Sequence, residues 1–316
     1  MRLRLLKFIA LAAACIMLAA ALAIRTPLMM AAHTTSEQQS GAVVFAVSGT
    51  NLPNASMEPF LIIENGTYKQ PVAGDSDAAE ISKFSDQYYR KGQKYRLLFG
   101  GGDAGAATVK SSGKDNECSR TSADVTLQTQ ARLNSNVMAL ATNSDSLGTG
   151  KGSRRVPTAA ERASAIALAQ TAFKQKGVAA ALLPSLTVIN LTALDLDRDG
   201  KSELIGSFVV KKTKGAQARH MLFLLAEPQG ANFKTAIAEY DQIDAKNIMS
   251  GSTITAIEQA GIYVERLLDQ LDLDGDGMGE VLTITTGLEG VGYTIHKKSQ
   301  GQWAKVYEFG NYHCAF

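Results

Sequence analysis

Short apolar runs separated by polar turns recur along most of the chain, a pattern typical of β-strands. In the first half, the Asn65-Gly66 pair and the triplet Gly100-Gly101-Gly102 mark turns, because glycine adopts backbone conformations closed to other residues. The pattern predicts strands at 42–47, 60–63, 95–99, 104–110, 125–127 and 137–141. The sequence therefore indicates a β-rich module over residues 24–142.

Two segments follow a helical period instead. Within 75–90, Ile81, Phe84 and Tyr88 recur at three- and four-residue spacing, which places them on one helix face. A longer helix is predicted at 159–175, since Thr158 and Glu161 form a capping box and Gly177 provides a stop. We expect this helix to pack on a neighbouring sheet rather than to bind a partner.

The second half contains an internal repeat. Strands are predicted at 182–195, 203–211, 220–226 and 233–241, and again at 263–272, 280–286, 292–298 and 303–309. An offset of 77 residues (272 minus 195) maps Asp195 onto Asp272, and the neighbouring acidic positions map with it. Each repeat is predicted to form a four-stranded antiparallel sheet.

These patterns together define the predicted organisation. Residues 1–23 form a signal peptide, 24–142 the N-terminal β module, 143–157 a Ser- and Gly-rich linker, and 158–316 the helix followed by two β repeats. The predicted fold class is mainly β with one or two helices, built from antiparallel four-stranded, partly propeller-like sheet units and the N-terminal β module.

The first residues indicate export. A basic start with Arg2, Arg4 and Lys7 precedes an apolar run to Leu22, and Ala21-Leu22-Ala23 is a small-x-small cleavage site. This predicts a secreted or periplasmic protein, with an uncleaved membrane anchor as the alternative, and with no membrane segment once the signal is removed.

Two cysteines remain after the predicted cleavage. In an oxidising compartment this pair favours a disulfide, while two unpaired buried thiols are the alternative. The predicted bridge joins Cys118 and Cys314. The net charge of +2 lies close to neutral, so no basic face for a nucleic-acid partner is expected.

Both repeats contain the acidic pattern Asp-x-Asp-x-Asp-Gly-x-x-Glu. Calcium takes about six to eight oxygen ligands, and carboxylates at positions 1, 3 and 5 of a tight loop can converge on one ion. The glycine at position 6 permits the sharp turn, position 7 offers a backbone carbonyl, and the glutamate at position 9 can close the shell. The predicted ligands are Asp195, Asp197, Asp199, Lys201 and Glu203 in the first loop, and Asp272, Asp274, Asp276, Met278 and Glu280 in the second.

The flanking residues distinguish these loops from a helix–loop–helix calcium hand. Such a hand requires a glutamate at position 12, where this chain has Gly206 and Thr283. The residues after Glu203 and Glu280 are β-type, so each loop is predicted to join two strands. A solvated acidic turn that binds no metal is the alternative for each loop.

The segments Leu194–Gly200 and Leu271–Gly277 resemble the calcium loops of FG-GAP/VCBS-type repeats, the blades of integrin-like β-propellers. The resemblance covers roughly residues 185–316. It implies structural calcium and a role in adhesion or carbohydrate binding more often than in catalysis. A propeller needs at least about four blades, and only two loops occur, so a two-unit β domain packed on the Thr158 helix is the alternative to a propeller.

Signs of catalysis are weak. The sequence contains neither a His-Glu-x-x-His zinc pattern nor a Gly-x-Ser-x-Gly elbow. We therefore predict a calcium-binding β-repeat protein with a binding or structural role, with carbohydrate or a cell-surface protein as candidate partners. The alternatives are an extracellular hydrolase with catalytic groups near 100–107 and structural calcium, and a cell-surface adhesin.

Overall fold

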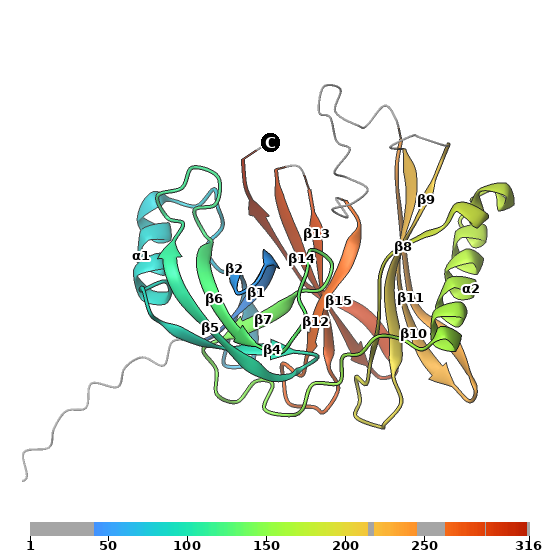
Figure 1. The fold of residues 1–316 in the computed structure, drawn as a ribbon, viewed down its shortest axis with the longest axis horizontal. Helices are drawn as coiled ribbons and strands as arrows, with labels where there is room; N and C mark the ends of the chain where they lie inside the picture. Colours follow the sequence, from blue (N-terminus) through green and yellow to red (C-terminus); the bar gives the residue numbers. More distant parts are fainter. Residues whose placement is uncertain (1–40, 214–217, 245–262, 288, 315–316) are drawn as a thin grey trace, which may run out of the picture. The chain divides into compact units, whose positions relative to one another are not determined.

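The computed structural model describes residues 41–213, 218–244, 263–287 and 289–314 (Figure 1). The predicted signal peptide lies outside these residues. The described chain is mainly β, as predicted, with fifteen strands, two α-helices and one 3-10 helix in these ranges. No helix in the described ranges is long and apolar enough to cross a membrane.

The N-terminal strands form a closed, barrel-like sheet. Its strand order is β1-β7-β4-β5-β6-β2, and the pairing of β1 with β2 closes it, while β3 is added beside β2. The strands are β1 (Ala42–Asn51), β2 (Asn54–Glu64), β3 (Thr67–Lys69), β4 (Lys94–Phe99), β5 (Gly102–Ser112), β6 (Ala123–Thr129) and β7 (Ala139–Thr142). Closure removes the free strand edges that an open sheet would expose.

Helix α1 (Ala78–Tyr88) contributes to the core of this barrel. Asp77 caps the helix by accepting a hydrogen bond from the Ala79 amide. Phe84 and Tyr88 then join the cluster of buried side chains from the strands, which includes Phe45. The predicted helical face at 75–90 is therefore the face that is buried.

The predicted repeat is present as two four-stranded antiparallel sheets. The first repeat sheet has the order β11-β10-β9-β8, and the second repeat sheet has the order β12-β13-β14-β15. Their strands are β8 (Thr187–Leu194), β9 (Glu203–Lys211), β10 (Arg219–Gln229) and β11 (Asn232–Ile243), then β12 (Glu265–Leu271), β13 (Glu280–Thr286), β14 (Gly290–Ser299) and β15 (Gln302–Tyr312). The other described strands belong to the barrel.

One predicted strand begins later than expected. The apolar run from Leu182 predicts a strand over 182–195, but residues Ala180–Ser185 form a 3-10 helix, η1, and β8 starts at Thr187. Pro184 lies inside η1 and has no amide hydrogen to donate to a strand ladder, which is consistent with this local structure.

Helix α2 (Ala159–Gln175) matches the predicted bounds. The Thr158 hydroxyl accepts from the Glu161 amide, and the Glu161 carboxylate accepts from the Thr158 amide, which completes the capping box. Phe173 is fully buried on the first repeat sheet, against side chains that include Phe208 and Leu222. The helix is thus a packing element, as expected.

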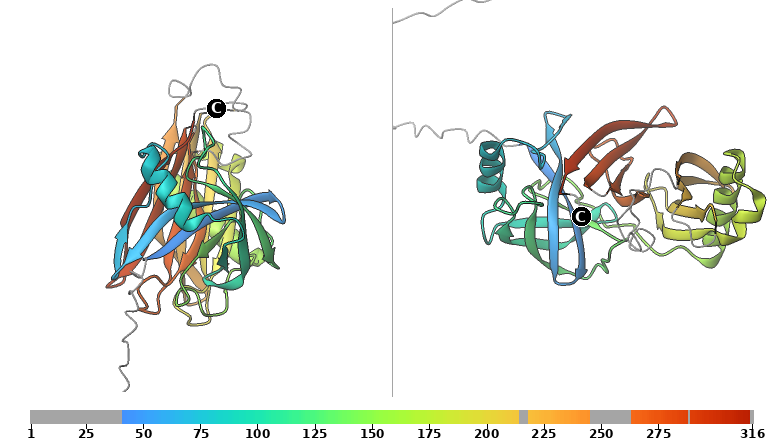
Figure 2. Two further views of the ribbon diagram at one scale, coloured as in Figure 1. Left: turned by 90° about the vertical axis from the view of Figure 1, so that its left-hand side faces the viewer. Right: turned by 90° about the horizontal axis from the view of Figure 1, so that it is seen from above.

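Four of the hydrophobic clusters fill or join the barrel, the two repeat sheets and α2, whose arrangement Figures 1 and 2 show. The first fills the barrel. The second joins the barrel to the second repeat sheet, as in the stacked pair Phe60 and Tyr293. The third joins the two repeat sheets and includes Phe223 and Leu267. The fourth joins the first repeat sheet to α2. The second repeat sheet therefore packs between the barrel and the first repeat sheet.

A glycine turn of the barrel docks on β12. Gly100 and Gly101 have φ values of 65° and 76°, so the predicted tight reversal joins β4 to β5. Both carboxylate oxygens of Asp269 accept from the Gly100 amide, at 3.0 and 2.8 Å, and Gln270 donates to the Gly100 carbonyl at 2.9 Å. The positive φ at position 101 favours glycine, and a Cβ there would lie 1.9 Å from Gln270 Nε2, so a larger residue would displace the Gln270 side chain.

The far end of the second repeat sheet is also tied to the barrel. Cys118, in the connection between β5 and β6, forms a disulfide with Cys314, which confirms the predicted bridge. Near it, the Asn311 side chain donates to Thr121 and accepts from the Gly74 amide. Covalent and polar contacts therefore hold the end of β15 against barrel loops.

Candidate metal centre

The two acidic loops occupy equivalent places in the two repeat sheets. The loop Asp195–Glu203 joins β8 to β9, and the loop Asp272–Glu280 joins β12 to β13. Each therefore links two strands of one sheet, as predicted. Gly200 and Gly277 have φ values of 85° and 89°, the left-handed region that position 6 of the pattern requires.

The loops also repeat the same internal hydrogen bonds. The Gly200 amide donates to Asp195 at 3.0 Å, and the Gly277 amide donates to Asp272 at 3.1 Å. At the next step, the Lys201 amide donates to Asp199 at 2.7 Å. Met278 and Asp276 make the matching bond at 2.9 Å. The acidic side chains are thus fixed by the loop backbone.

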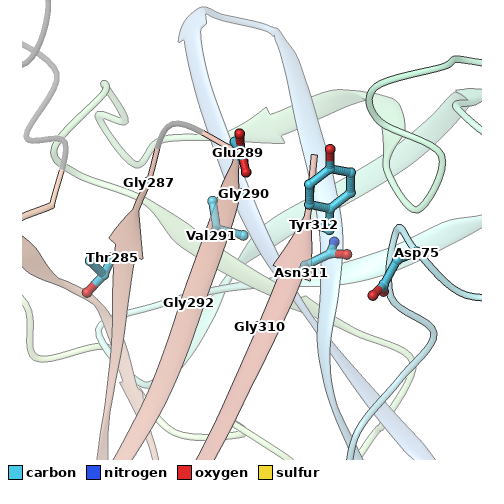
Figure 3. Close-up of a pocket in the computed structure, with 10 residues that line it drawn as sticks. All are labelled: Asp75, Thr285, Gly287, Glu289, Gly290, Val291, Gly292, Gly310, Asn311 and Tyr312. Carbon is cyan, nitrogen blue, oxygen red and sulfur yellow. The ribbon is translucent and has the colours of Figure 1, made fainter. Parts of the chain in front are cut away.

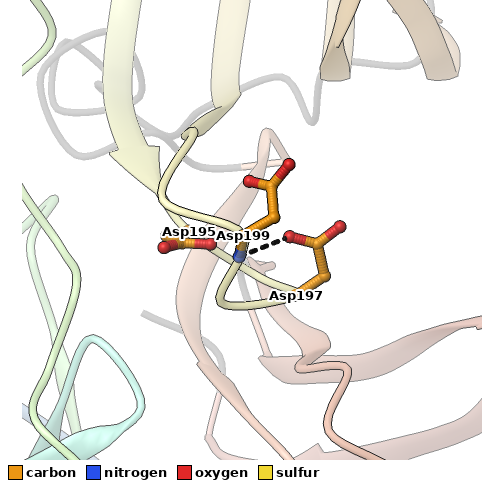
Figure 4. A group of neighbouring side chains, drawn as sticks. All are labelled: Asp195, Asp197 and Asp199. Atoms are coloured by element: carbon orange, nitrogen blue, oxygen red, sulfur yellow. Dashed lines mark hydrogen bonds between the residues drawn. The ribbon is translucent and has the colours of Figure 1, made fainter.

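In each loop the three aspartates converge. One carboxylate oxygen from each of Asp195, Asp197 and Asp199 lies within 4.8 Å of the other two, and the same holds for Asp272, Asp274 and Asp276. Figure 4 shows the first of these groups around its turn, with Asp197 accepting from the Asp199 amide at 3.1 Å. This spacing suits oxygen ligands around one hard cation.

The glutamate at position 9 is buried in both loops. Glu203 accepts from the Leu196 amide at 2.9 Å, and Glu280 accepts from the Leu273 amide at 2.8 Å. Burial, with a smaller contribution from the neighbouring carboxylates of Asp195 and Asp197, raises the pKa of Glu203 to about 7, although the Leu196 hydrogen bond opposes the shift. Burial also raises the pKa of Glu280, but Lys297 opposes that shift. Whether the Lys201 and Met278 carbonyls act as ligands stays a prediction.

The two loops touch one another and the 143–157 connection. The Gly279 amide donates to the Leu196 carbonyl at 2.7 Å, which joins the second loop to the first. The Ser153 hydroxyl lies 3.2 Å from both the carbonyl and the amide nitrogen of Asp195. The first loop is therefore held from two sides.

The donor sets of the two loops differ in how their charge is balanced. In the first loop, Oδ1 of Asp195 is buried and has no hydrogen-bond partner, which suits a cation ligand. In the second loop, the Lys297 ammonium hydrogen-bonds Asp274 and lies 3.3 Å from Asp276 and 3.2 Å from Glu280. The first loop fits a metal ion, whereas a side-chain cation already contacts the second.

The described histidines and the cysteine beside His313 have partners away from the acidic loops. His220 contacts the Tyr240 hydroxyl at 2.7 Å, and His296 contacts Glu265 at 2.9 Å. His313 contacts Glu58 at 3.1 Å, and this hydrogen bond raises its pKa. The neighbouring Cys314 is bonded to Cys118, so it does not offer a thiolate beside His313.

Of the segment 100–107, which the hydrolase alternative names, the Gly100 backbone serves the junction described above, and Asp103 pairs with Arg96 at 3.2 Å. Asp269 is fully buried and Arg154 lies 3.6 Å from it. Arg154 also donates to the carbonyls of Met138 and Leu268, both at 3.0 Å. These contacts position the barrel against β12 and leave both side chains almost without solvent exposure.

Two hollows lie away from the acidic loops. One, of about 490 Å³, lies along β13–β15 and is lined largely by glycine backbone, with Asp75 and Glu289 as its acidic side chains (Figure 3). The other, of about 450 Å³, lies between barrel strands and the second repeat sheet and is lined by Glu58, His313 and Arg266 among others. Arg266 donates to Ser135, Asn136 and Thr286.

Comparison of the chain with protein-family models, with curated proteins and with solved structures finds no match in any of the three.

Proposed function

We propose that this chain is an exported calcium-binding β-repeat protein, with a binding or structural role in which calcium at the acidic loops stabilises the repeat sheets. The observation that carries the proposal is the duplicated loop geometry. The same strand-to-strand position in both sheets holds three converging aspartates, a left-handed glycine and a buried glutamate.

Electrostatics supports a cation at these positions. Four carboxylates within one short loop repel one another, and a bound dication removes that cost. The first loop supports this argument most directly, because Glu203 is only 6% exposed and its neighbours Asp195 and Asp197 add negative charge beside it. Carboxylate and carbonyl oxygens are the ligands that calcium prefers.

The expected consequence is stabilisation by linkage. An ion that binds the folded loop and not the unfolded chain contributes about 2.7 kcal/mol at a free concentration of 100 times its dissociation constant. For a chain of this size, about 1 kcal/mol corresponds to a shift of roughly 2–4 °C in melting temperature. Saturating calcium should therefore raise the melting temperature by roughly 5–10 °C.

The test compares melting temperatures with calcium and with a chelator for the mature chain and for Asp197→Ala. The variant should lose the part of the calcium-dependent rise that the first loop contributes. Asp145→Ala, at an exposed aspartate outside the loops, is the matched control and should retain it. A melting temperature that calcium leaves unchanged in the unmodified protein, together with no calcium recovered in equilibrium dialysis, would refute the proposal.

A further inference from the structure

Lys297 lies beside the carboxylates that the sequence pattern predicts as metal ligands in the second acidic loop. It lies on β14, and its ammonium group contacts three carboxylates of the loop, those of Asp274, Asp276 and Glu280. Oε1 of Glu280 is buried and makes no directional hydrogen bond, so its charge is met by the ammonium group 3.2 Å away.

The first loop has no counterpart to this arrangement among the described residues. The cation nearest its carboxylates is Lys201, whose ammonium lies 3.2 Å from the outer oxygen of Asp199 and whose side chain is 67% exposed. Lys201 therefore contacts one exposed carboxylate, whereas Lys297 reaches three, including a fully buried glutamate. The two loops share a sequence pattern but differ in their charge balance.

Strand register explains the difference. In the second repeat sheet, Val281 pairs with His296, so the next position along places Lys297 beside Glu280. In the first repeat sheet, Leu204 pairs with Ala226, so the corresponding neighbour of Glu203 is Glu227. The repeat thus has a base in one copy where the other copy has an acid.

The lysines that pair with Glu227 do not neutralise the first loop. Its carboxylate accepts from Trp303 Nε1 at 2.9 Å and pairs with Lys298 at 2.6 Å and with Lys234 at 3.3 Å. Lys298 and Lys234 thus pair with Glu227, and neither of these ion pairs includes Asp195, Asp197 or Asp199.

From this contrast we propose that Lys297 is the resident cation of the second loop, so that the chain binds one calcium ion, at the first loop. In the second loop the Lys297 ammonium group neutralises the acidic side chains in place of a metal ion. This inference rests on the proposed function for the first loop and departs from the symmetric pair of sites that the sequence pattern predicts.

The physical reason is competition for the same oxygens. A calcium ion in the second loop would have to displace the ammonium group from Asp274, Asp276 and Glu280 or lie beside it, and two like charges a few ångströms apart repel. Lys297 would also have to find new partners in solvent. We expect calcium to bind the second loop at least tenfold more weakly than the first.

The experiment measures calcium stoichiometry by equilibrium dialysis and titration calorimetry on the purified full mature chain. At free calcium that saturates the first loop and stays below the dissociation constant of the second, the unmodified protein should bind one ion, and Lys297→Met should bind two. Asp197→Asn should bind none, and Asp274→Asn should still bind one. Lys305→Met removes a lysine of the same sheet that pairs with Glu239 at 2.6 Å, away from the loops, and should still bind one.

A second measurement covers the case in which the variant is poorly folded without metal. Lys297→Met leaves three carboxylates without their cation, so its melting temperature in chelator should fall below that of the unmodified chain and should recover when calcium is added. Lys305→Met should show no such calcium-dependent recovery beyond that of the unmodified chain.

The outcomes separate the two proposals. Two ions in the unmodified chain, or one ion that Asp274→Asn abolishes, would overturn the role given to Lys297 and leave calcium binding in place. A folded Lys297→Met chain that binds one ion and shows no calcium-dependent recovery beyond that of the unmodified chain would overturn it as well. No ion in any variant, Lys297→Met included, would overturn calcium binding itself.

Discussion

Removing Asp269 should destabilise the protein more than removing any exposed carboxylate. This side chain is fully buried, accepts a bifurcated hydrogen bond from the Gly100 amide and lies 3.6 Å from Arg154. Asp269→Ala would leave the Arg154 guanidinium, which is 3% exposed, without a counter-charge. It would also leave the Gly100 amide without an acceptor.

The magnitude follows from these two losses. Breaking a buried ion pair by removing one partner costs about 3–5 kcal/mol, and an unsatisfied buried amide costs about 1–3 kcal/mol. The contributions are not additive, because Arg154 keeps its bonds to Met138 and Leu268. We expect a loss of about 4 kcal/mol in the free energy of unfolding, or roughly 8–16 °C in melting temperature.

Urea denaturation followed by circular dichroism measures this loss. Asp86→Ala is the control, because Asp86 forms an ion pair with Lys114 at 3.0 Å but is 69% exposed, and such pairs contribute at most about 1 kcal/mol. The combined change Arg154→Met with Asp269→Ala should cost less than the sum of the single changes, since no unpaired buried charge remains. A loss below about 1 kcal/mol for Asp269→Ala in a folded protein would refute the account of this junction.

Three further predictions concern the same fold. Burial raises the pKa of Asp269 to about 6, above its value of about 3.9 in an unfolded chain, so the folded state binds the proton more tightly. The free energy of unfolding should therefore fall by about 3 kcal/mol as the pH rises from about 4 to about 6. Urea denaturation at a series of pH values should show that Asp269→Asn loses this pH dependence. Replacing Cys118 and Cys314 with serine should lower the free energy of unfolding by about 2–5 kcal/mol, since the bridge closes a sequence separation of 196 residues. Equal stability of the oxidised protein and this variant would contradict the predicted stabilisation by the disulfide. Phe173→Ala should cost about 3–5 kcal/mol in thermal or urea unfolding because its ring is fully buried between α2 and the first repeat sheet, whereas a cost under about 1 kcal/mol would show that the helix is dispensable for stability.

Local patterns predicted the elements of the second half well. The two acidic loops end at Glu203 and Glu280, where β9 and β13 begin, because glycine turns and β-branched runs mark such boundaries in the sequence. The capping box at Thr158 likewise placed the start of α2. These features depend on residues within a few positions of one another, which is the range that a sequence pattern reports.

Closure of the barrel could not be predicted in the same way. Pairing of Phe45 with Ala141 and of Val44 with Leu61 closes the sheet. Tertiary packing determines both pairings, and the alternation of apolar and polar residues along one strand does not specify them. A period of two indicates which face of a strand is buried, but not which strand lies beside it.

The role of Lys297 was missed for a related reason. It follows Glu280 by 17 positions, and nothing in the acidic pattern refers to it. It reaches the loop because the hairpin of β13 and β14 pairs Val281 with His296. Counting the register from the predicted strands 280–286 and 292–298 would pair Glu280 with Lys298, one position away, so only the observed pairing identifies Lys297.

The disulfide described above also determines how the molecule carries mechanical load. A pull on the chain beyond Cys314 passes through the sulfur bridge to Cys118 and so into the barrel, bypassing both repeat sheets. The residues enclosed by the bridge span a separation of 196, which would add roughly 650 Å if drawn out straight. While the bridge is intact that length stays inaccessible to stretching, and both acidic turns remain within one covalent ring even when their sheets come apart.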